Sequence, residues 1–487
     1  MENVPLQIVL GIAGIFLLLC VIASKASTKL GVPALVLFLG VGMLAGSDGI
    51  GGIQFSDAGL AKTLGTIALA FILFSGGLDT RWEVIKPVVL RGVSLATVGV
   101  VATAALVGLF THYVLGFGLI EGLLLGAVVS STDAAAVFGV LRSRSVQLKH
   151  RITPLLEFES GSNDPLAVFM TVGLTELALN SEANPWHLLP SLLLQLPVGI
   201  AVGYAVGIAA AWVINRVRLE YDGLYPVVTI AAACISFGIA YVLRGNEFMS
   251  VYIAGLTLGN RNFLRKVTLL QFHEAIAWLM QITMFVVLGL LVFPKQVLEV
   301  ALPGLALSAF LMLVARPLAV FLSLAFSRMK KRTKFFISWA GLRGAVPIIL
   351  ATFPLLEEVP VSNTIFNLVF FVVLTSVAIQ GTTLAPMARW LGVVHSGREV
   401  ASDMRPARNS EIMEVIVEAD SPADGRQVVE LALPPTSLLV LLKRGGTSYI
   451  PRGGTVLRPG DIVMIATRRE DHEDLRSRFQ QRPHQVA

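Results

Sequence analysis

The stretch Glu-Ser-Gly-Ser-Asn-Asp-Pro, which begins at Glu159, is the densest polar cluster inside an apolar run of this sequence. In a helix, Ser160, Asn163 and Asp164 lie at positions i, i+3 and i+4, so three oxygen-bearing side chains share one face. Such oxygen ligands suit Na⁺ or K⁺. Pro165 has no N–H, so the carbonyl four residues earlier loses its helical donor and can serve as a further ligand. Because burial disfavours the charged form of a carboxyl group, Asp164 can hold either a proton or a metal ion, and this competition is sufficient for exchange.

Two other polar interruptions can complete such a site. Residues 130–133 read Ser-Ser-Thr-Asp, side chains that compete with a helix for backbone hydrogen bonds. They predict an unwound point at Thr132, with Asp133 as the N-cap of a new half-helix. Residues 341–347 read Gly-Leu-Arg-Gly-Ala-Val-Pro and predict a second broken helix, in which Arg343 would compensate a negative helix end while Asp133 answers a positive one. Interrupted helices at matching positions in two halves of a chain are typical of transporter sites.

The charges inside apolar runs need partners. A charged side chain at the centre of a bilayer costs about 2.5–3.5 kcal/mol even on the lenient insertion scale. Glu159 and Arg316 carry opposite charges within such runs, which predicts a buried, structural ion pair. The alternative for the polar residues as a group is that they only bond one membrane helix to another, or mark a kink without a ligand role.

The elements that must position these residues are membrane helices. The chain has 487 residues, of which 55% are hydrophobic and only 14% charged, against about 25% charged in soluble domains. Its positive charge, +6, lies between apolar runs, so cytoplasmic loops explain it better than nucleic-acid binding does. Because a membrane helix needs about 20 apolar residues, the sequence predicts thirteen spans. These are 6–24, 32–46, 60–78, 88–115, 119–141, 152–179, 188–215, 224–243, 249–260, 270–293, 300–327, 335–355 and 364–391.

The loop charges alternate in phase with these spans. Nineteen Lys and Arg residues fall in one set of loops and three in the other, Lys62, Arg244 and Lys295. By the positive-inside rule, the N-terminus is expected outside and the C-terminus in the cytoplasm. The nineteen are Lys25, Lys29, Arg81, Lys86, Arg91, Arg142, Arg144, Lys149, Arg151, Arg216, Arg218, Arg261, Arg265, Lys266, Arg328, Lys330, Lys331, Arg332 and Lys334.

The character of the chain changes after residue 395. A polar linker, 396–410, precedes a segment at 411–480 in which short alternating strands are separated by Gly-rich turns, and a tail follows at 481–487. This pattern predicts a small cytoplasmic α+β domain. The segment contains no nucleophile constellation and no metal-ligand spacing, so a regulatory or dimerising role is expected rather than an enzymatic one. The strands are expected at 413–418, 438–443 and 461–466.

Taken together, the three polar clusters of residues 1–395 resemble the NhaP-like branch of the cation/proton antiporters. The resemblance implies a homodimer in the bacterial inner membrane, inverted repeats, two crossed broken helices and electroneutral one-for-one exchange. It also implies that Asp164 binds the cation and the proton, helped by Ser160, Asn163, Thr132 and Asp133. One departure concerns residues 74–78, Phe-Ser-Gly-Gly-Leu, where many relatives carry an acid at the position of Ser75.

The segment 411–480 resembles the RCK C-terminal (TrkA-C) domain, which implies regulation by a small cytoplasmic ligand such as a nucleotide. The combination resembles the potassium/proton antiporters, with K⁺ favoured over Na⁺ and no tightly bound cofactor expected. Two alternatives remain open. An RCK-gated potassium channel would need a Thr-Val-Gly-Tyr-Gly filter, which the sequence lacks. A cation-coupled carrier for an organic solute is the other.

Overall fold

The chain divides into two compact units, Met1–His395 and Ser396–Ala487. Each unit is described by itself. In this computed structural model the described residues are 5–30, 34–144, 146–149, 151–180, 188–217, 221, 223–263, 265–394, 410–444, 447–468 and 471–479. The predicted linker 396–410 lies almost entirely outside them, as does the predicted tail.

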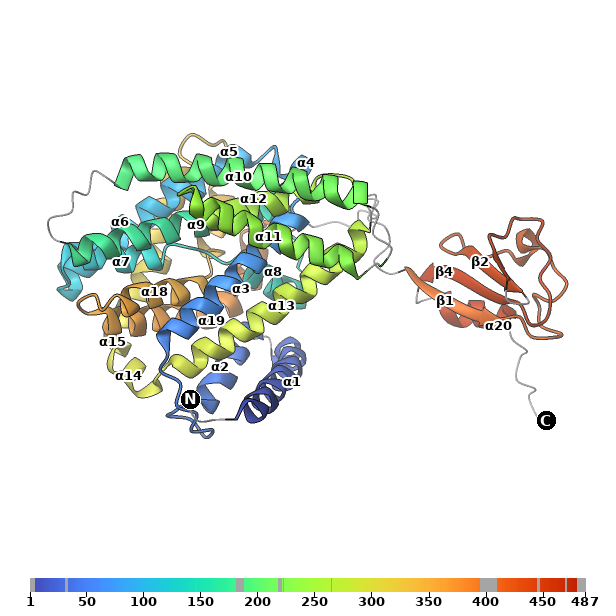
Figure 1. The fold of residues 1–487 in the computed structure, drawn as a ribbon, viewed down its shortest axis with the longest axis horizontal. Coiled ribbons are helices and arrows are strands. Elements are labelled where there is room, and N and C mark those ends of the chain that lie inside the picture. Colours follow the sequence, from blue (N-terminus) through green and yellow to red (C-terminus); the bar gives the residue numbers. More distant parts are fainter. Residues whose placement is uncertain are drawn as a thin grey trace. The chain divides into compact units, whose positions relative to one another are not determined.

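The first unit is helical (Figure 1). Its longer helices are α1 (Leu6–Leu30), α3 (Ala58–Asp79), α6 (Val100–Leu115), α9 (Ile152–Leu179), α10 (Leu188–Val217), α11 (Leu224–Val242), α13 (Lys266–Leu291) and α19 (Ser362–Trp390). Its shorter helices are α2 (Ala34–Ala45), α4 (Trp82–Ile85), α5 (Val89–Ser94), α7 (Leu119–Val128), α8 (Ala134–Ser143), α12 (Glu247–Gly259), α14 (Pro294–Glu299), α15 (Ala301–Phe310), α16 (Arg316–Ser323), α17 (Lys331–Trp339) and α18 (Val346–Leu356). Two π-helical turns, η1 (Leu95–Gly99) and η3 (Leu311–Ala315), join α5 to α6 and α15 to α16.

Eight helices within the described residues are long and apolar enough to cross a membrane. Shorter apolar helices lie at four other predicted spans, including α2 and α12 at the two shortest predicted runs, and the long helix α9 lies at the predicted span 152–179. The expectation of a polytopic helical protein is confirmed, whereas the count of thirteen spans stays a prediction. The predicted spans 119–141 and 335–355 are each two half-helices, as the polar interruptions had indicated.

The interruptions recur at the same places in the two halves of the unit. Each broken pair, α7–α8 and α17–α18, directly follows a span that contains a π-helical turn. The two π-containing spans also pack against each other, α16 against η1 and α6 against η3. Sequence reasoning missed both π turns, because an extra residue per turn leaves no signal in an apolar run. Their matched positions favour the internal repeat, which the sequence alone did not reveal.

Helix α12 packs backbone to backbone between α3 and α10. A Cβ atom at Gly77 of α3 would lie 2.3 Å from the carbonyl oxygen of Tyr252, and one at Gly255 would lie 2.3 Å from that of Phe74. On the other side, a Cβ atom at Gly203 of α10 would lie 2.2 Å from the carbonyl oxygen of Ser250. Small residues at such crossings let membrane helices approach closely. These three helices therefore form one tightly packed panel.

The second unit is a four-stranded antiparallel sheet in the order β1-β4-β2-β3, and residues of the 3-10 helix η4 (Val428–Leu431) and of the helix His472–Phe479 pack into its core. Met413 of β1 and Leu439 of β2 both pair with Ile465 of β4, and all three side chains enter one core. The expected small β-containing domain is confirmed, but β3 and α20 were missed, since a three-residue strand leaves almost no alternation. The elements are β1 (Ser410–Ile416), β2 (Leu438–Arg444), β3 (Thr447–Tyr449), β4 (Ile462–Arg468) and α20 (His472–Phe479).

An ion pair between a partly exposed arginine and a buried aspartate holds the turn that leads into β4. The Nε and Nη2 atoms of Arg444 donate to the two carboxylate oxygens of Asp461, each at 2.6 Å, and the N–H of Arg458 donates to the same carboxylate. Asp461 is 1% exposed. Burial alone would raise the pKa of this carboxyl, but the hydrogen bonds from Arg444 and Arg458 outweigh burial and hold it below its usual range.

We expect Asp461→Asn to destabilise the second unit by about 1.5–3 kcal/mol at neutral pH, the usual contribution of a hydrogen bond to a charged group. A carboxyl whose pKa is lowered by folding stabilises the fold above its unfolded-state pKa, about 3.9, and this stabilisation is lost as the pH falls through the folded-state value. The difference between variant and native chain should therefore shrink below pH 4. Proteolytic susceptibility of this unit in the full-length chain, followed against temperature at pH 7 and pH 4, measures it.

Candidate ion-binding site

Two unwound segments cross at the centre of the site. The first lies between α7 and α8, and the second between α17 and α18. The N–H of Asp133 donates to the carbonyl of Leu342 at 2.8 Å, which joins the two segments directly. The Asp133 side chain also accepts from the N–H of Ala136 at 3.0 Å and so caps α8. The two crossed broken helices expected from the resemblance are confirmed.

Arg343 closes the other end of the first break. Its Nη1 atom donates to the carbonyl oxygens of Ser130 and Ser131, at 2.8 and 2.6 Å. These carbonyls follow the C-terminal end of α7, where the partial charge of a helix is negative. Arg343 is 1% exposed, so its charge is placed against this helix end rather than in water. The structure thus places Arg343 and Asp133 at the two helix ends of the first break, and their role in compensating the helix charges stays a prediction.

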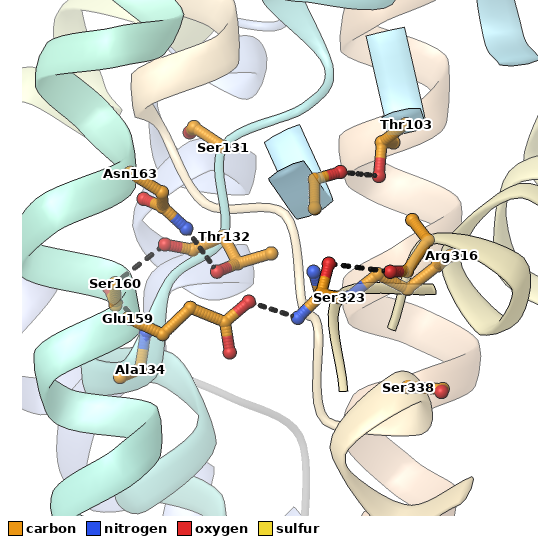
Figure 2. Close-up of polar contacts among 12 residues, drawn as sticks. Thr103, Ser131, Thr132, Ala134, Glu159, Ser160, Asn163, Arg316, Ser323 and Ser338 are labelled. Atoms are coloured by element: carbon orange, nitrogen blue, oxygen red, sulfur yellow. Dashed lines mark hydrogen bonds and ion pairs between the residues drawn. The ribbon is translucent and has the colours of Figure 1, made fainter. Parts of the chain in front are cut away.

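Helix α9 supports the unwound segment from the side (Figure 2). The hydroxyl of Ser160 donates to the carbonyl of Thr132 at 2.9 Å and accepts from the N–H of Ala134, the first residue of α8, at 3.0 Å. The Asn163 Nδ2 atom donates to the Thr132 hydroxyl at 2.6 Å. Ser160 and Asn163 therefore serve both as neighbours of Asp164 and as the ties that hold the break in place.

The carboxyl group of Asp164 has an oxygen atom that is free to accept a proton or a cation. The side chain is 5% exposed, and its Oδ1 atom has no hydrogen-bond partner among the described residues, nor has Oδ1 of Asn163. The Asp164 carboxyl group interacts electrostatically with the side chains of Asp133 and Ser131. Pro165 deprives a helical carbonyl of its donor one turn earlier. Buried oxygen atoms that lack donors are costly unless a proton or a cation satisfies them. The cluster therefore has the chemistry to bind a proton or a cation.

The predicted pair Glu159 and Arg316 is in contact. Glu159 Oε1 and Arg316 Nη2 form an ion pair, and both side chains are 2% exposed (Figure 2). A Cβ atom at Gly341, beside the second break, would lie 2.6 Å from Arg316 Nε, so the pair is packed against that break. Three carboxylates (of residues 133, 159 and 164) and two guanidinium groups (of residues 316 and 343) surround the crossing. Fully ionised they leave one net negative charge, which one proton or one monovalent cation neutralises.

The comparisons with known proteins agree with this geometry. A sequence profile for the family described as "Sodium/hydrogen exchanger, transmembrane" matches residues 14–390. The chain belongs to this exchanger family. A second profile, for the TrkA-C domain, matches residues 412–480, so both resemblances are confirmed.

Two relatives of this exchanger align over nearly its whole length. The "K(+)/H(+) antiporter NhaP" of Alkalimonas amylolytica is 37% identical over 481 residues, which are 98% of this chain and 83% of that protein. The "K(+)/H(+) antiporter NhaP2" of Shewanella sp. (strain ANA-3) is 38% identical over 475 residues, 95% of this chain and 82% of that protein. Among solved structures, the sodium proton antiporter MjNhaP1 from Methanocaldococcus jannaschii covers 79% of this chain and 99% of its own, with a TM-score of 0.70 and 25% identity.

Sequence reasoning missed the residues that tie this exchanger's site to its surroundings. Asn246, the N-cap of α12, donates from Nδ2 to the carbonyl of Pro165 at 3.1 Å. The hydroxyl of Ser376 accepts from the N–H of Arg343 at 3.1 Å and donates to Gln380. The sequence did offer a signal for Ser376 and Gln380, because both are polar residues within the apolar run 364–391. Nothing in the sequence pointed from Asn246 to α9.

The position at which the resemblance implies an acid, Ser75, lies on α3. Ser75 is 6% exposed, and its helix packs against α12 and contacts α9. A serine offers one neutral oxygen where the resemblance implies a carboxylate. The departure noted from the sequence therefore falls at a buried position of the first unit.

Gly344 leaves no room for a side chain at the crossing. A Cβ atom there would lie 2.1 Å from Asp133 Oδ2 and 2.7 Å from Asp133 Cβ, which cannot move without moving the cap of α8. We expect Gly344→Ala to lower the free energy of unfolding by about 1–3 kcal/mol and to reduce exchange strongly, because the added methyl group would displace the first break.

The matched control is Gly139→Ala in α8, where a Cβ atom would have no neighbour within 4 Å. It should be neutral or slightly stabilising, since alanine is the better helix former. Thermal unfolding of the purified protein, together with exchange in vesicles, compares the two. Equal behaviour of both variants would contradict the tight crossing.

Proposed function

We propose that this protein exchanges a monovalent cation for a proton across the membrane, with K⁺ favoured over Na⁺. The observation that carries the proposal is the buried Asp164 carboxyl, whose Oδ1 atom, like Oδ1 of the neighbouring residue Asn163, has no hydrogen-bond partner in the part of the chain that the structure describes. Ser160, Thr132 and the cap residue Asp133 hold this pair in position. A proton and a cation compete for the same carboxylate, so loading one releases the other.

One titrating charge sets the proposed stoichiometry. The five ionisable groups at the crossing leave a net charge of −1, and either one H⁺ or one K⁺ restores neutrality. The site should then present the same net charge in both loaded states. Exchange would be one for one and would move no net charge across the membrane.

The preference for K⁺ has two supports. The two relatives that align over nearly the whole chain carry the printed name K(+)/H(+) antiporter, whereas the Na⁺-type neighbour is 25% identical and covers a smaller share. The chain also has Ser75 at the position where the resemblance implies a carboxylate. A site with fewer charges has a weaker field, which disfavours the smaller and more strongly hydrated Na⁺.

Everted membrane vesicles test the proposal. Respiration acidifies their interior, and a quenched pH dye reports dissipation of the gradient when K⁺, Na⁺ or Li⁺ is titrated outside across a range of pH. An antiporter dequenches the dye at unchanged membrane potential, a channel passes current, and a solute symporter needs its solute. Dequenching by Na⁺ but not by K⁺ would overturn the proposed preference.

The placement of the chain is part of the proposal. The loop charges favour a periplasmic N-terminus and a cytoplasmic C-terminus, in a bacterial inner membrane. Helix α1 lies at the margin of the first unit, and only 6% of its most apolar window is buried there (Figure 1). Such a helix needs lipid or a second protomer against it, as a homodimer would provide. Transport is the whole proposed activity, with no enzymatic reaction.

We expect the TrkA-C domain to regulate exchange through a small cytoplasmic ligand such as a nucleotide. Deleting residues 409–487 should leave the exchange activity in place, because the site lies entirely in the first unit, and should change its dependence on the ligand or on cytoplasmic pH. Exchange in everted vesicles, measured across pH with and without ATP as a probe nucleotide, checks this. A well-folded but inactive truncation would show that the domain belongs to the transport unit.

A further inference from the structure

A basic pocket lies at one end of the transport unit, away from the crossing. It has a volume of about 390 Å³ and is lined by Lys149, Lys330, Arg332, Thr333 and the turn that follows α19. At about 30 Å³ per water molecule, it has room for roughly a dozen waters or for an anion of similar size. Among the described residues that line it there are three cations and no acid.

Three separate segments build this pocket. Lys149 belongs to the loop after α8, and its Nζ atom donates to the carbonyl of Gly392 at 2.5 Å, just after α19. The N–H of Lys149 donates to the carbonyl of Val393. The third segment is the start of α17, the first half of the second broken helix. The pocket therefore joins the outer ends of both broken helices to the last residues of the transport unit.

The start of α17 has unfavourable electrostatics as it stands. The N-terminal end of a helix carries partial positive charge and favours acidic residues or a side-chain cap. Here the N-cap is Lys330, which makes no capping hydrogen bond, and Lys331 and Arg332 occupy the first turn without an acid. Three like charges on the positive end of a helix repel one another and the helix dipole. An anion in the pocket would relieve this repulsion.

We propose that this pocket binds a phosphate-bearing anion. Phosphate groups suit both Lys and Arg, and the planar guanidinium of Arg332 can hold two phosphate oxygens at once. The pocket lies at the end of the bundle that we propose to face the cytoplasm. Basic pockets between membrane helices on that side are suited to lipid headgroups.

The surroundings of the pocket determine which source of phosphate is favoured. Trp390, directly before the lining turn, is 77% exposed, and Phe335, which shares a face of α17 with Arg332, is 51% exposed. Exposed aromatic side chains at helix ends are typical of the headgroup level of a bilayer. They would contact the chains of a lipid whose headgroup occupies the pocket, whereas a soluble phosphate compound would not use them.

The test is binding of a single anion by the full-length protein in detergent. The variant is Lys149→Gln/Lys330→Gln/Arg332→Gln. The matched control is Lys86→Gln/Arg216→Gln/Arg261→Gln, which removes three exposed cations from elsewhere in the first unit. One arm titrates phosphatidylglycerol against phosphatidylcholine and counts bound lipids by native mass spectrometry. The other arm titrates inorganic pyrophosphate and follows the shift in melting temperature.

We expect one phosphatidylglycerol molecule to bind the native chain and the control. Its affinity for the pocket variant should be about 100-fold lower, because each lost cation weakens binding about fivefold. Binding should also weaken with salt. Stabilisation by pyrophosphate that depends on the same three residues would assign the pocket to soluble phosphate compounds and still support the anion site. Because Lys149 also bonds Gly392, Lys330→Gln/Arg332→Gln provides a second variant that leaves this contact intact. Equal binding by the native chain and both pocket variants, in both arms, would overturn the proposal.

Discussion

Asp164→Asn should abolish cation-dependent proton exchange while the protein still inserts and folds. The asparagine keeps the size of the side chain but cannot give up a proton, so the competition between proton and cation is lost. Its effect on stability should stay within about 1 kcal/mol, since it buries an uncharged group of the same shape. Dye dequenching in everted vesicles at several pH values, with expression checked in the same membranes, measures the result.

A matched control removes a carboxylate elsewhere. Glu299→Gln changes an exposed acid at the end of α14, far along the chain from the crossing, and should leave exchange unchanged. Exchange that persisted in Asp164→Asn at any pH would remove this residue from the mechanism. The one-for-one stoichiometry would then lose its basis as well.

Arg316→Met should have the largest effect on stability. It leaves the Glu159 carboxylate buried at 2% exposure without its partner, and breaking a buried ion pair in this way costs about 3–5 kcal/mol. We expect a strongly lowered yield from membranes and a lowered melting temperature in detergent. Arg216→Met, at an exposed position, should change stability by less than about 0.5 kcal/mol.

The double variant Glu159→Leu/Arg316→Met separates the ion pair from the site. Replacing both charges by apolar groups of similar volume is often nearly neutral, so the melting temperature should recover towards the native value. A double-mutant cycle over the four proteins gives the coupling energy. Full recovery of both stability and exchange would assign the pair a structural role. Recovery of stability without exchange would show that the pair also contributes to transport.

The local features of the site could be predicted from sequence. Asp133 caps α8 by accepting from the N–H three residues further on, and Ser160, Asn163 and Asp164 share a face because helix geometry requires it. Glu159 and Arg316 are 157 residues apart in the sequence. Their pairing was nevertheless predictable, because few oppositely charged residues lie within the apolar runs. The proposed roles of these residues in transport stay predictions.

Other contacts could not be predicted, because they depend on how helices cross. The bond from Asp133 N–H to the Leu342 carbonyl uses backbone groups that every residue has, so no side-chain type marks it. The same is true of the carbonyl of Pro165, to which Asn246 donates from a different helix. Fold class follows from composition and periodicity, whereas the alignment of two breaks follows from packing.

Two very different kinds of contact surround α12. Towards α3 and α10, glycines place backbone against backbone, and any sliding would drive a carbonyl into a neighbouring Cα. Towards α9 the contacts are the ring of Tyr252, which lies where a Cβ atom of Gly161 would be only 2.6 Å away, and the amide of Asn246. A ring and an amide can release and rebind by rotation about two side-chain bonds. If α9 is displaced during turnover, we expect it to slide along this side-chain contact with α12, while α3, α10 and α12 stay packed together.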